Sequence, residues 1–166
     1  MPLDRFWAAW REQYVSGAIA SLNALDQAQC VFCALGTQEV GESTGVLWRS
    51  DTTYVALNAY PYGSGHLLVM PCRHVSTLAE LTEEEYQQYF LALRHTAMAL
   101  EMAYGADGMN IGLNLGVAAG AGIPKHLHAH VLPRWIGDTN FMTSIGETRV
   151  LSESLEATWQ KVHDHF

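Results

Sequence analysis

The chain carries the stretch His126-Leu127-His128-Ala129-His130-Val131-Leu132, in which histidine alternates with an apolar residue. On a β-strand, alternate side chains share one face and stand roughly 6.6 Å apart, at about 3.3 Å per residue. We therefore predict a strand over 126–132 whose three imidazoles line one face, while Leu127, Ala129 and Val131 enter the core. Pro133 is expected to end this strand because proline cannot donate to a ladder.

Three histidines on one strand face indicate chemistry, because stability alone gives no reason to choose them there. A polar, solvated face is the plain alternative. An open zinc site made of all three is a sharper one, since histidines two apart on a strand can chelate one ion. Used for chemistry, a neutral imidazole is a nucleophile toward phosphorus, and an imidazolium donates to phosphate oxygens.

The cysteines provide further candidate ligands. Cys30-Val31-Phe32-Cys33 has a spacing typical of a metal half-site or a redox pair, and the stretch before it is not strand-like, which disfavours the redox interpretation. His74 follows a predicted strand. Together with one histidine of the 126–130 stretch, these residues would complete a closed, structural Cys₂His₂ zinc site. Two histidines would then remain for chemistry.

A glycine-rich loop precedes the histidines. Gly116, Gly120 and Gly122 allow a phosphate to approach backbone N–H groups closely. Asn114 adds a neutral amide before this loop, and the bracketing cations Lys125 and Arg134 add positive charge to an otherwise acidic chain.

The pattern around these motifs predicts an α+β fold with an antiparallel sheet, one long helix and a C-terminal helix, because strands precede and follow the long helix. That helix is expected over 83–104, with a capping box formed by Thr82 and Glu85 and an end at Gly105. Further elements are expected as strands over 46–48, 52–57, 66–70 and 109–115 and as helices over 4–16 and 151–163.

Composition limits the function. The chain has 166 residues, which fits one domain, with 9 basic and 17 acidic residues and a net charge of −8. Because no basic run is present, nucleic-acid binding is not expected. No apolar run approaches the length of a membrane span and the N-terminus does not resemble a signal peptide, so we expect a cytoplasmic protein without membrane contact. Only 16% of residues are charged, which predicts a homodimer that covers apolar surface.

The combined motifs resemble the histidine triad (HIT) superfamily of nucleotide hydrolases and transferases over roughly residues 28–135. The triad is accompanied, in the family's order and spacing, by Cys30-Val31-Phe32-Cys33, Leu57-Asn58, Gly65-His66-Leu67-Leu68-Val69-Met70-Pro71, His74 and Asn114-Leu115-Gly116. Flanking aromatic segments are similar to the bacterial branch that includes diadenosine tetraphosphate phosphorylases. The resemblance implies a single HIT-like domain over 1–166, with an N-terminal helical extension (about 1–28), a core (about 29–135) and a C-terminal segment (136–166).

The resemblance also implies roles for individual residues. His128 would attack the α-phosphorus and form a nucleotidyl-histidine, while His130 would hold phosphate oxygens. His126 would be the histidine that completes the zinc site. The implied zinc ligands are Cys30, Cys33, His74 and His126. The implied substrate-binding residues are Asn58 at the ribose, with Asn114, Gly120, Ala121, Gly122 and His130 at the phosphates.

The implied activity is cleavage of dinucleoside polyphosphates such as diadenosine tetraphosphate, with inorganic phosphate favoured over water as the acceptor. The alternatives are a hydrolase or phosphoramidase of the same family that uses water, and a nucleotide-binding module with weak catalysis. Many family members carry a hydroxyl or amide side chain just before the triad, whereas here the stretch is Gly120-Ala121-Gly122-Ile123-Pro124-Lys125. This departure bears on the choice of leaving group and acceptor.

Overall fold

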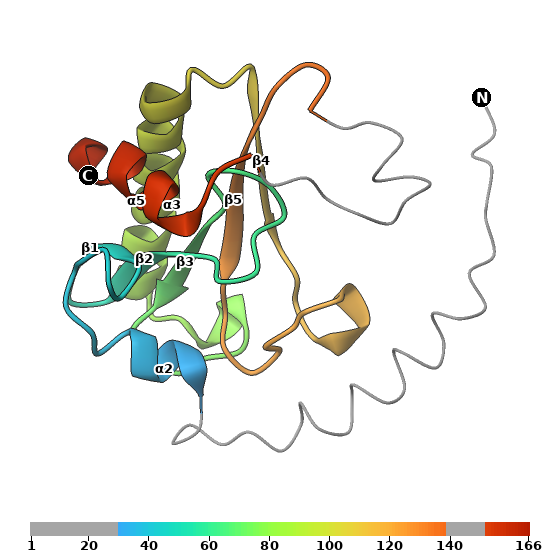
Figure 1. Cartoon of the computed structure of the whole chain (residues 1–166). Coiled ribbons are helices and arrows are strands. Elements are labelled where there is room, and N and C mark those ends of the chain that lie inside the picture. Colours follow the sequence, from blue (N-terminus) through green and yellow to red (C-terminus); the bar gives the residue numbers. More distant parts are fainter. Residues whose placement is uncertain (1–29, 139–151) are drawn as a thin grey trace, which may run out of the picture.

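The computed structural model describes residues 30–138 and 152–166, so the helix expected over 4–16 lies outside the described residues. The described elements, shown in Figure 1, are α2 (Val31–Leu35), β1 (Val46–Arg49), β2 (Thr53–Leu57), β3 (Leu67–Pro71), η2 (Leu78–Glu80), α3 (Glu83–Tyr104), β4 (Gly108–Leu113), η3 (Val117–Ala119), β5 (Ala129–Arg134), α5 (Leu155–Val162) and η4 (His163–His165). None of the described helices is long and apolar enough to cross a membrane.

The five strands form one antiparallel sheet in the order β1-β2-β3-β5-β4, which confirms the predicted fold class. Strand β3 is buried along its whole length, and four of the five residues of β2 are buried. Strand β5 lies between β3 and β4, so the sheet brings the histidine stretch beside the segment that leads into β3. Strand β4 forms an edge of the sheet.

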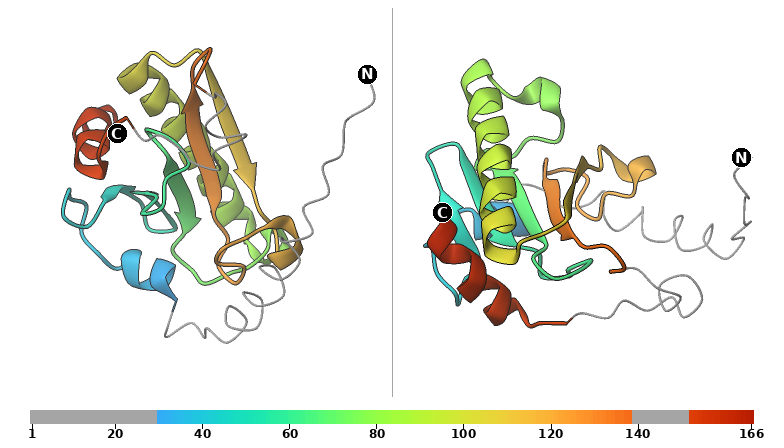
Figure 2. Two further views of the ribbon diagram at one scale, coloured as in Figure 1. Left: turned by 45° about the vertical axis from the view of Figure 1, so that its right-hand side comes forward. Right: turned by 90° about the horizontal axis from the view of Figure 1, so that it is seen from above.

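Helix α3 covers one face of the sheet and forms as its local sequence predicts (Figure 2). The Thr82 side chain accepts a hydrogen bond from the Glu85 N–H, and the Glu85 carboxylate accepts one from the Thr82 N–H, at 3.2 and 2.8 Å. Gly105 ends the helix in the left-handed conformation, with φ 54°. A capping box and an αL glycine are short-range signals, which is why both ends of this helix could be predicted.

The two faces of the sheet bury different residues. Val55, Val69 and Val131 face α3 in the larger hydrophobic cluster, together with Leu127 and Ala129. The alternate residues of β2 and β3 point to the opposite face, where they pack with Cys30 and Phe32 of the α2 segment. The apolar members of the histidine stretch therefore enter the core as predicted.

The histidine strand begins later and ends later than the sequence predicts. It runs from Ala129 to Arg134 rather than over 126–132, because the Leu127 N–H donates to the Val75 carbonyl at 2.6 Å instead of joining the ladder. Pro133 does not end the strand. It pairs with Met109 on β4, beyond the last residue of β5 that pairs with β3.

The C-terminal helix α5 packs beside α3 and begins after its N-cap Ser154, whose hydroxyl accepts from the Ala157 N–H at 3.2 Å. The Glu153 carboxylate holds this helix in place, since it accepts hydrogen bonds from Tyr104, Thr158 and Lys161. The helix predicted over 151–163 is thus present as Leu155–Val162.

Candidate metal centre and active site

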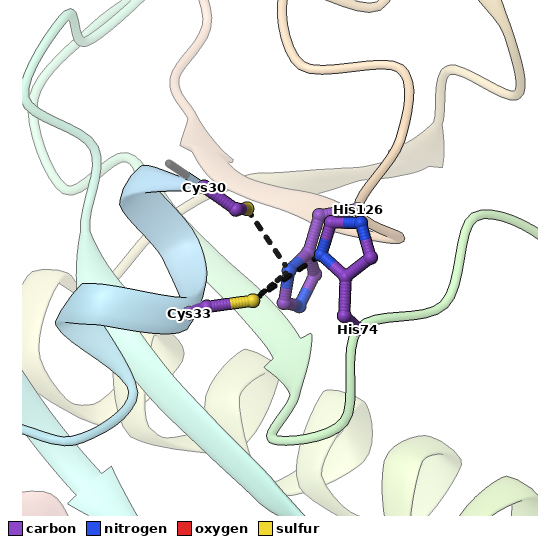
Figure 3. A group of neighbouring side chains, drawn as sticks. All are labelled: Cys30, Cys33, His74 and His126. Atoms are coloured by element: carbon purple, nitrogen blue, oxygen red, sulfur yellow. Dashed lines mark hydrogen bonds between the residues drawn. The ribbon is translucent and has the colours of Figure 1, made fainter. Parts of the chain in front are cut away.

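The four predicted metal ligands come together on the face of the sheet opposite α3. Cys30 directly precedes α2 and Cys33 lies within it, His74 lies in the loop after β3, and His126 lies three residues before β5. Figure 3 shows the two thiols facing the two imidazoles. The four ligand atoms all lie within 4.8 Å of one another, and this group is the only such cluster found among the described residues.

The geometry of this cluster fits a tetrahedral zinc ion. The Nδ1 atom of His126 lies 3.4 Å from Cys30 Sγ and 3.5 Å from Cys33 Sγ, while His74 Nδ1 lies 3.2 Å from Cys33 Sγ. Bond lengths of about 2.3 Å to sulfur and about 2.0 Å to nitrogen place neighbouring ligands of a tetrahedral zinc roughly 3.5 Å apart. Four protein ligands would close the site to water, which fits a structural ion.

A main-chain carbonyl fixes the orientation of His126. Its Nε2 lies 2.9 Å from the Pro71 carbonyl oxygen, an acceptor, so Nε2 carries the proton and Nδ1 turns its lone pair toward the thiols. Burial, together with the proximity of His74 and His128, lowers the pKa of His126 to about 4, although the hydrogen bond to the Pro71 carbonyl opposes this shift. The imidazole is therefore neutral near pH 7, as a metal ligand must be.

His128 has the opposite tautomer. Its Nδ1 lies 2.8 Å from the His126 carbonyl oxygen, so Nδ1 carries the proton and Nε2 keeps its lone pair. Burial lowers the pKa of His128, which favours the neutral form. Phe32 packs against one side of this ring, with centroids 5.1 Å apart, and His130 lies on another side at 5.2 Å. His128 is therefore a buried imidazole that keeps a lone pair on Nε2 and is held between two rings.

His130 is paired with a histidine from the segment before β3. His130 Nδ1 lies 2.9 Å from Nε2 of His66, whose Nδ1 accepts a hydrogen bond from the Tyr62 N–H at 2.9 Å. The other ring nitrogen of His130, Nε2, is buried and has no hydrogen-bond partner among the described residues. Burial, followed by the proximity of His128, lowers the pKa of His130 to about 4.

Asn58 lies close to this pair, but its amide is already engaged. Its Oδ1 accepts a hydrogen bond from the Tyr60 N–H at 2.9 Å, and its Nδ2 lies 3.3 Å from Nδ1 and 3.4 Å from Nε2 of His66. The side chain is buried. In this structure Asn58 therefore holds the loop that precedes β3, and a ribose contact through its amide would require these partners to be shared.

The loop over 116–122 has the open backbone that its glycines predict. Gly116 and Gly120 adopt φ values of 80° and 86°, and a Cβ at either position would meet nothing within 4 Å. The loop already uses three of its N–H groups, because Ala119 and Ala121 donate to the Gly116 carbonyl and Gly120 donates to that of Val117. An anion held by main-chain groups would therefore rely on the other amides of the loop.

The remaining polar candidates around the triad differ in position. Asn114 directly follows β4 and is partly exposed, while Ala121 is buried and Gly122 exposed. Arg134 does not add free charge beside the triad as expected. Its guanidinium binds both carboxylate oxygens of Asp138, at 2.6 and 2.7 Å, and the Asn110 side chain at 2.6 Å. Its position at the last residue of β5 allows this pairing.

Two residues of the site were not predicted from the sequence. Phe32, which lies between the two cysteines, packs against both His126 and His128, and Tyr62 packs against both His66 and His130. The signal for Phe32 was its place inside the cysteine motif. The signal for Tyr62 was an aromatic turn directly before a strand, but only the pairing of β3 with β5 brings that turn to the triad.

Comparison with known proteins identifies a family model and named relatives that this chain resembles. The sequence profile of the HIT domain matches residues 41–135. The AP-4-A phosphorylase of Mycobacterium tuberculosis is 35% identical over 157 residues, which cover 94% of this chain and 80% of that protein. The bis(5'-adenosyl)-triphosphatase of Saccharomyces cerevisiae is 37% identical over 91 residues, which cover 54% of this chain and 44% of that protein.

A solved structure agrees with these matches. The Zn-bound histidine triad family protein from Mycobacterium smegmatis superposes with a TM-score of 0.68 at 26% identity, over 84% of this chain and 94% of that one. The antiparallel sheet, the long helix and the histidine stretch at the start of β5 are thus accompanied by sequence identity over most of the chain. This chain belongs to the HIT family.

Proposed function

We propose that the protein is an enzyme that cleaves dinucleoside polyphosphates, such as diadenosine tetraphosphate, through a nucleotidyl intermediate on His128. The names of its relatives in Mycobacterium tuberculosis and Saccharomyces cerevisiae support this substrate class. The observation that carries the mechanism is the hydrogen bond from His128 Nδ1 to the His126 carbonyl, because it leaves the Nε2 lone pair available to attack phosphorus.

The proposed reaction has two steps. In the first, His128 Nε2 forms a bond to the α-phosphorus, and the anhydride P–O bond breaks so that the electron pair leaves with ATP. In the second, an oxygen of inorganic phosphate attacks the same phosphorus, the N–P bond breaks and ADP forms. Splitting the reaction lets the contacts to the first nucleotide serve both transition states.

His130 is proposed to stabilise the charge that develops on the phosphate oxygens. A buried N–H at its Nε2 would lack a partner, and a phosphate oxygen would provide one. Asn114 and the loop residues Gly120, Ala121 and Gly122 are proposed to bind the phosphates, and Asn58 to lie at the ribose. The N–H groups of Gly120 and Ala121 already donate within the loop, so these two residues would have to share those groups with a phosphate. The support for these five residues is their resemblance to family positions, together with the open backbone at Gly120.

Product analysis tests the acceptor. With diadenosine tetraphosphate and millimolar phosphate, we expect ATP and ADP, at a rate that rises with the phosphate concentration. Release of ATP and AMP at full rate without phosphate would instead indicate water as the acceptor, as in a hydrolase. Nucleotide binding without turnover at any phosphate concentration would contradict an enzymatic function and favour a binding module.

Zinc is proposed as a structural cofactor, held by Cys30, Cys33, His74 and His126. The support is the close approach of the four ligand atoms and the second hydrogen bond of His126 to Pro71. When bound, the ion would tie the α2 segment to the loop after β3 and the loop before β5, and would keep both cysteines as thiolates. Metal analysis of protein purified without chelators should give one zinc per chain, and no zinc would contradict this proposal.

Cysteines that serve as zinc ligands must stay reduced, which supports the cytoplasm as the proposed location. Fluorescence microscopy of the tagged chain in its host, or fractionation, tests this. A homogeneous cytoplasmic signal is expected, and an enriched periplasmic or extracellular fraction would contradict it.

A homodimer is proposed from the surface of the sheet edge and of α3. Strand β4 lies at the edge and exposes Ile111, and α3 exposes apolar side chains at spacings of four or eight residues. These side chains are Tyr86, Phe90, Met98 and Met102, each at least 40% exposed. Light scattering should give the mass of two chains, and Met98→Glu combined with Met102→Glu should give the mass of one. A wild-type mass of one chain would contradict the proposal.

A further inference from the structure

We propose that Tyr62 and His66 are positioning residues, which together set the hydrogen-bonding polarity of His130, so that His130 presents an N–H at Nε2 rather than a lone pair. The inference deepens the proposed function, on which its catalytic meaning rests. The polarity itself concerns three residues of the folded chain and does not depend on any substrate.

The hydrogen-bonded chain that ends at His130 begins at a main-chain N–H. The Tyr62 N–H can only donate, and it lies 2.9 Å from Nδ1 of His66, so this nitrogen must offer its lone pair. A neutral imidazole carries one proton, which places the proton of His66 on Nε2. The same atom lies 2.9 Å from Nδ1 of His130, so His66 donates and His130 Nδ1 accepts. The proton of a neutral His130 is then on Nε2.

The Tyr62 side chain supports the same arrangement. Its ring lies 4.6 Å from the His66 ring and 5.3 Å from the His130 ring, with an angle of 25° between the planes of Tyr62 and His130. It therefore packs against both imidazoles and restricts their rotation. The loop is held from its other end by Asn58, whose Oδ1 accepts from the Tyr60 N–H.

This arrangement gives the two histidines at the reaction centre opposite polarity. A carbonyl fixes His128 with its lone pair on Nε2, whereas an N–H, acting through His66, fixes His130 with its proton on Nε2. A nucleophile requires the first and an oxyanion contact requires the second. Main-chain groups in two separate loops thus give two histidines of the triad different roles, one as nucleophile and one as oxyanion contact.

The first test is a nitrogen-15 NMR measurement on protein labelled in histidine, zinc-loaded and free of nucleotide, at pH 7. We expect both His66 and His130 to be protonated at Nε2 and unprotonated at Nδ1. A proton on Nδ1 of His130 would overturn the proposal. Because no substrate is present, this result is independent of whether the protein cleaves dinucleoside polyphosphates.

The second test uses substitutions with different donor properties. His66→Leu removes the donor to His130, and the fixed tautomer signature of His130 should be lost. His66→Gln places an amide N–H at a similar reach and should restore it. If turnover of diadenosine tetraphosphate is observed, kcat should fall about fivefold to tenfold in His66→Leu, the size expected for one neutral hydrogen bond, with a smaller change in KM.

Controls separate positioning from loss of folding. Each variant must keep its zinc content, and its Tm must exceed the assay temperature. Tyr62→Ala should broaden the His130 signals and lower kcat, and Tyr62→Phe should restore both. Tyr60 is 85% exposed, so Tyr60→Ala serves as the matched loop control and should change neither. Unaltered His130 signals in both His66→Leu and Tyr62→Ala would overturn the proposal.

Discussion

The two ends of the triad have the same residue type and lie in different environments. At one end, His126 directs Nδ1 toward two cysteines and another histidine, while its Nε2 is bound to a carbonyl. At the other end, His130 directs Nδ1 toward His66, and its Nε2 has no partner among the described residues. The group bound to the second ring nitrogen therefore decides whether a histidine is suited to bind a metal or a phosphate.

His128 lies between these ends, and its substitution should have the largest effect on activity. His128→Ala removes the proposed nucleophile, so turnover should fall by a factor on the order of 1,000 or more. Nucleotide affinity should stay within about tenfold, because the other contacts remain. Steady-state kinetics and calorimetric binding provide the two numbers. Full activity in His128→Ala would contradict the assignment of the nucleophile.

At position 130, kcat should depend on the presence of an N–H donor rather than on histidine itself. His130→Leu removes the proposed phosphate contact and should lower kcat about 100-fold, as expected for one lost oxyanion donor. His130→Gln keeps an N–H at a similar reach, so it should retain most of this activity. Both variants are measured in one assay. Equal losses of kcat in His130→Gln and His130→Leu would contradict the proposed phosphate contact.

At the metal end, substitution should affect stability more than chemistry. Cys33→Ser removes one proposed zinc ligand, and Tm should fall by about 10 °C, corresponding to several kcal/mol for a chain of this size. The fraction that remains folded should keep turning over substrate. Cys72 is a free thiol outside the cluster, so Cys72→Ser is the matched control and should change Tm little. Equal changes in both variants would argue against the metal centre.

The smallest expected effect is on the pH dependence of the free energy of unfolding. The pKa of His130 is lowered from 6.5 to about 4, so the unfolded chain takes up this proton at a higher pH than the folded protein does. The contribution of His130 to the free energy of unfolding is therefore fully present above about pH 6.5 and is lost as the pH falls toward 4.

The free energy of unfolding of His130→Gln should consequently depend less on pH than that of wild type across this window. Denaturant unfolding of both proteins at several pH values measures the difference. The pH dependence of zinc binding cancels, since both proteins share the same four ligands. Parallel curves from pH 6.5 to pH 4 would show that His130 is not held neutral by burial.

Local signals in the sequence predict part of this molecule well. Thr82, Glu85 and Gly105 mark both ends of α3, and the alternation of histidine with apolar residues predicts which side chains of the stretch are buried. The spacing of Cys30 and Cys33, with His74, predicts the metal cluster that the structure brings together.

Non-local contacts could not be predicted in this way. The late start of β5 depends on a hydrogen bond from Leu127 to Val75, and the pairing of Arg134 with Asp138 depends on the turn after β5. The polarity of His130 depends on the register of β3 and β5, which brings His66 to it. That register cannot be predicted from a sequence motif or from the spacing of residues.

The most direct test of the central claim locates the nucleotidyl group among the three histidines. Trypsin cleaves after Lys125 and Arg134, so one peptide contains the whole triad. Protein mixed with diadenosine tetraphosphate without phosphate, quenched in alkali and digested, is fragmented in a mass spectrometer. We expect the AMP adduct on His128, with His126 and His130 unmodified. An adduct on His126 or His130, or turnover at full rate with no adduct on any of the three, would contradict the roles assigned to the triad.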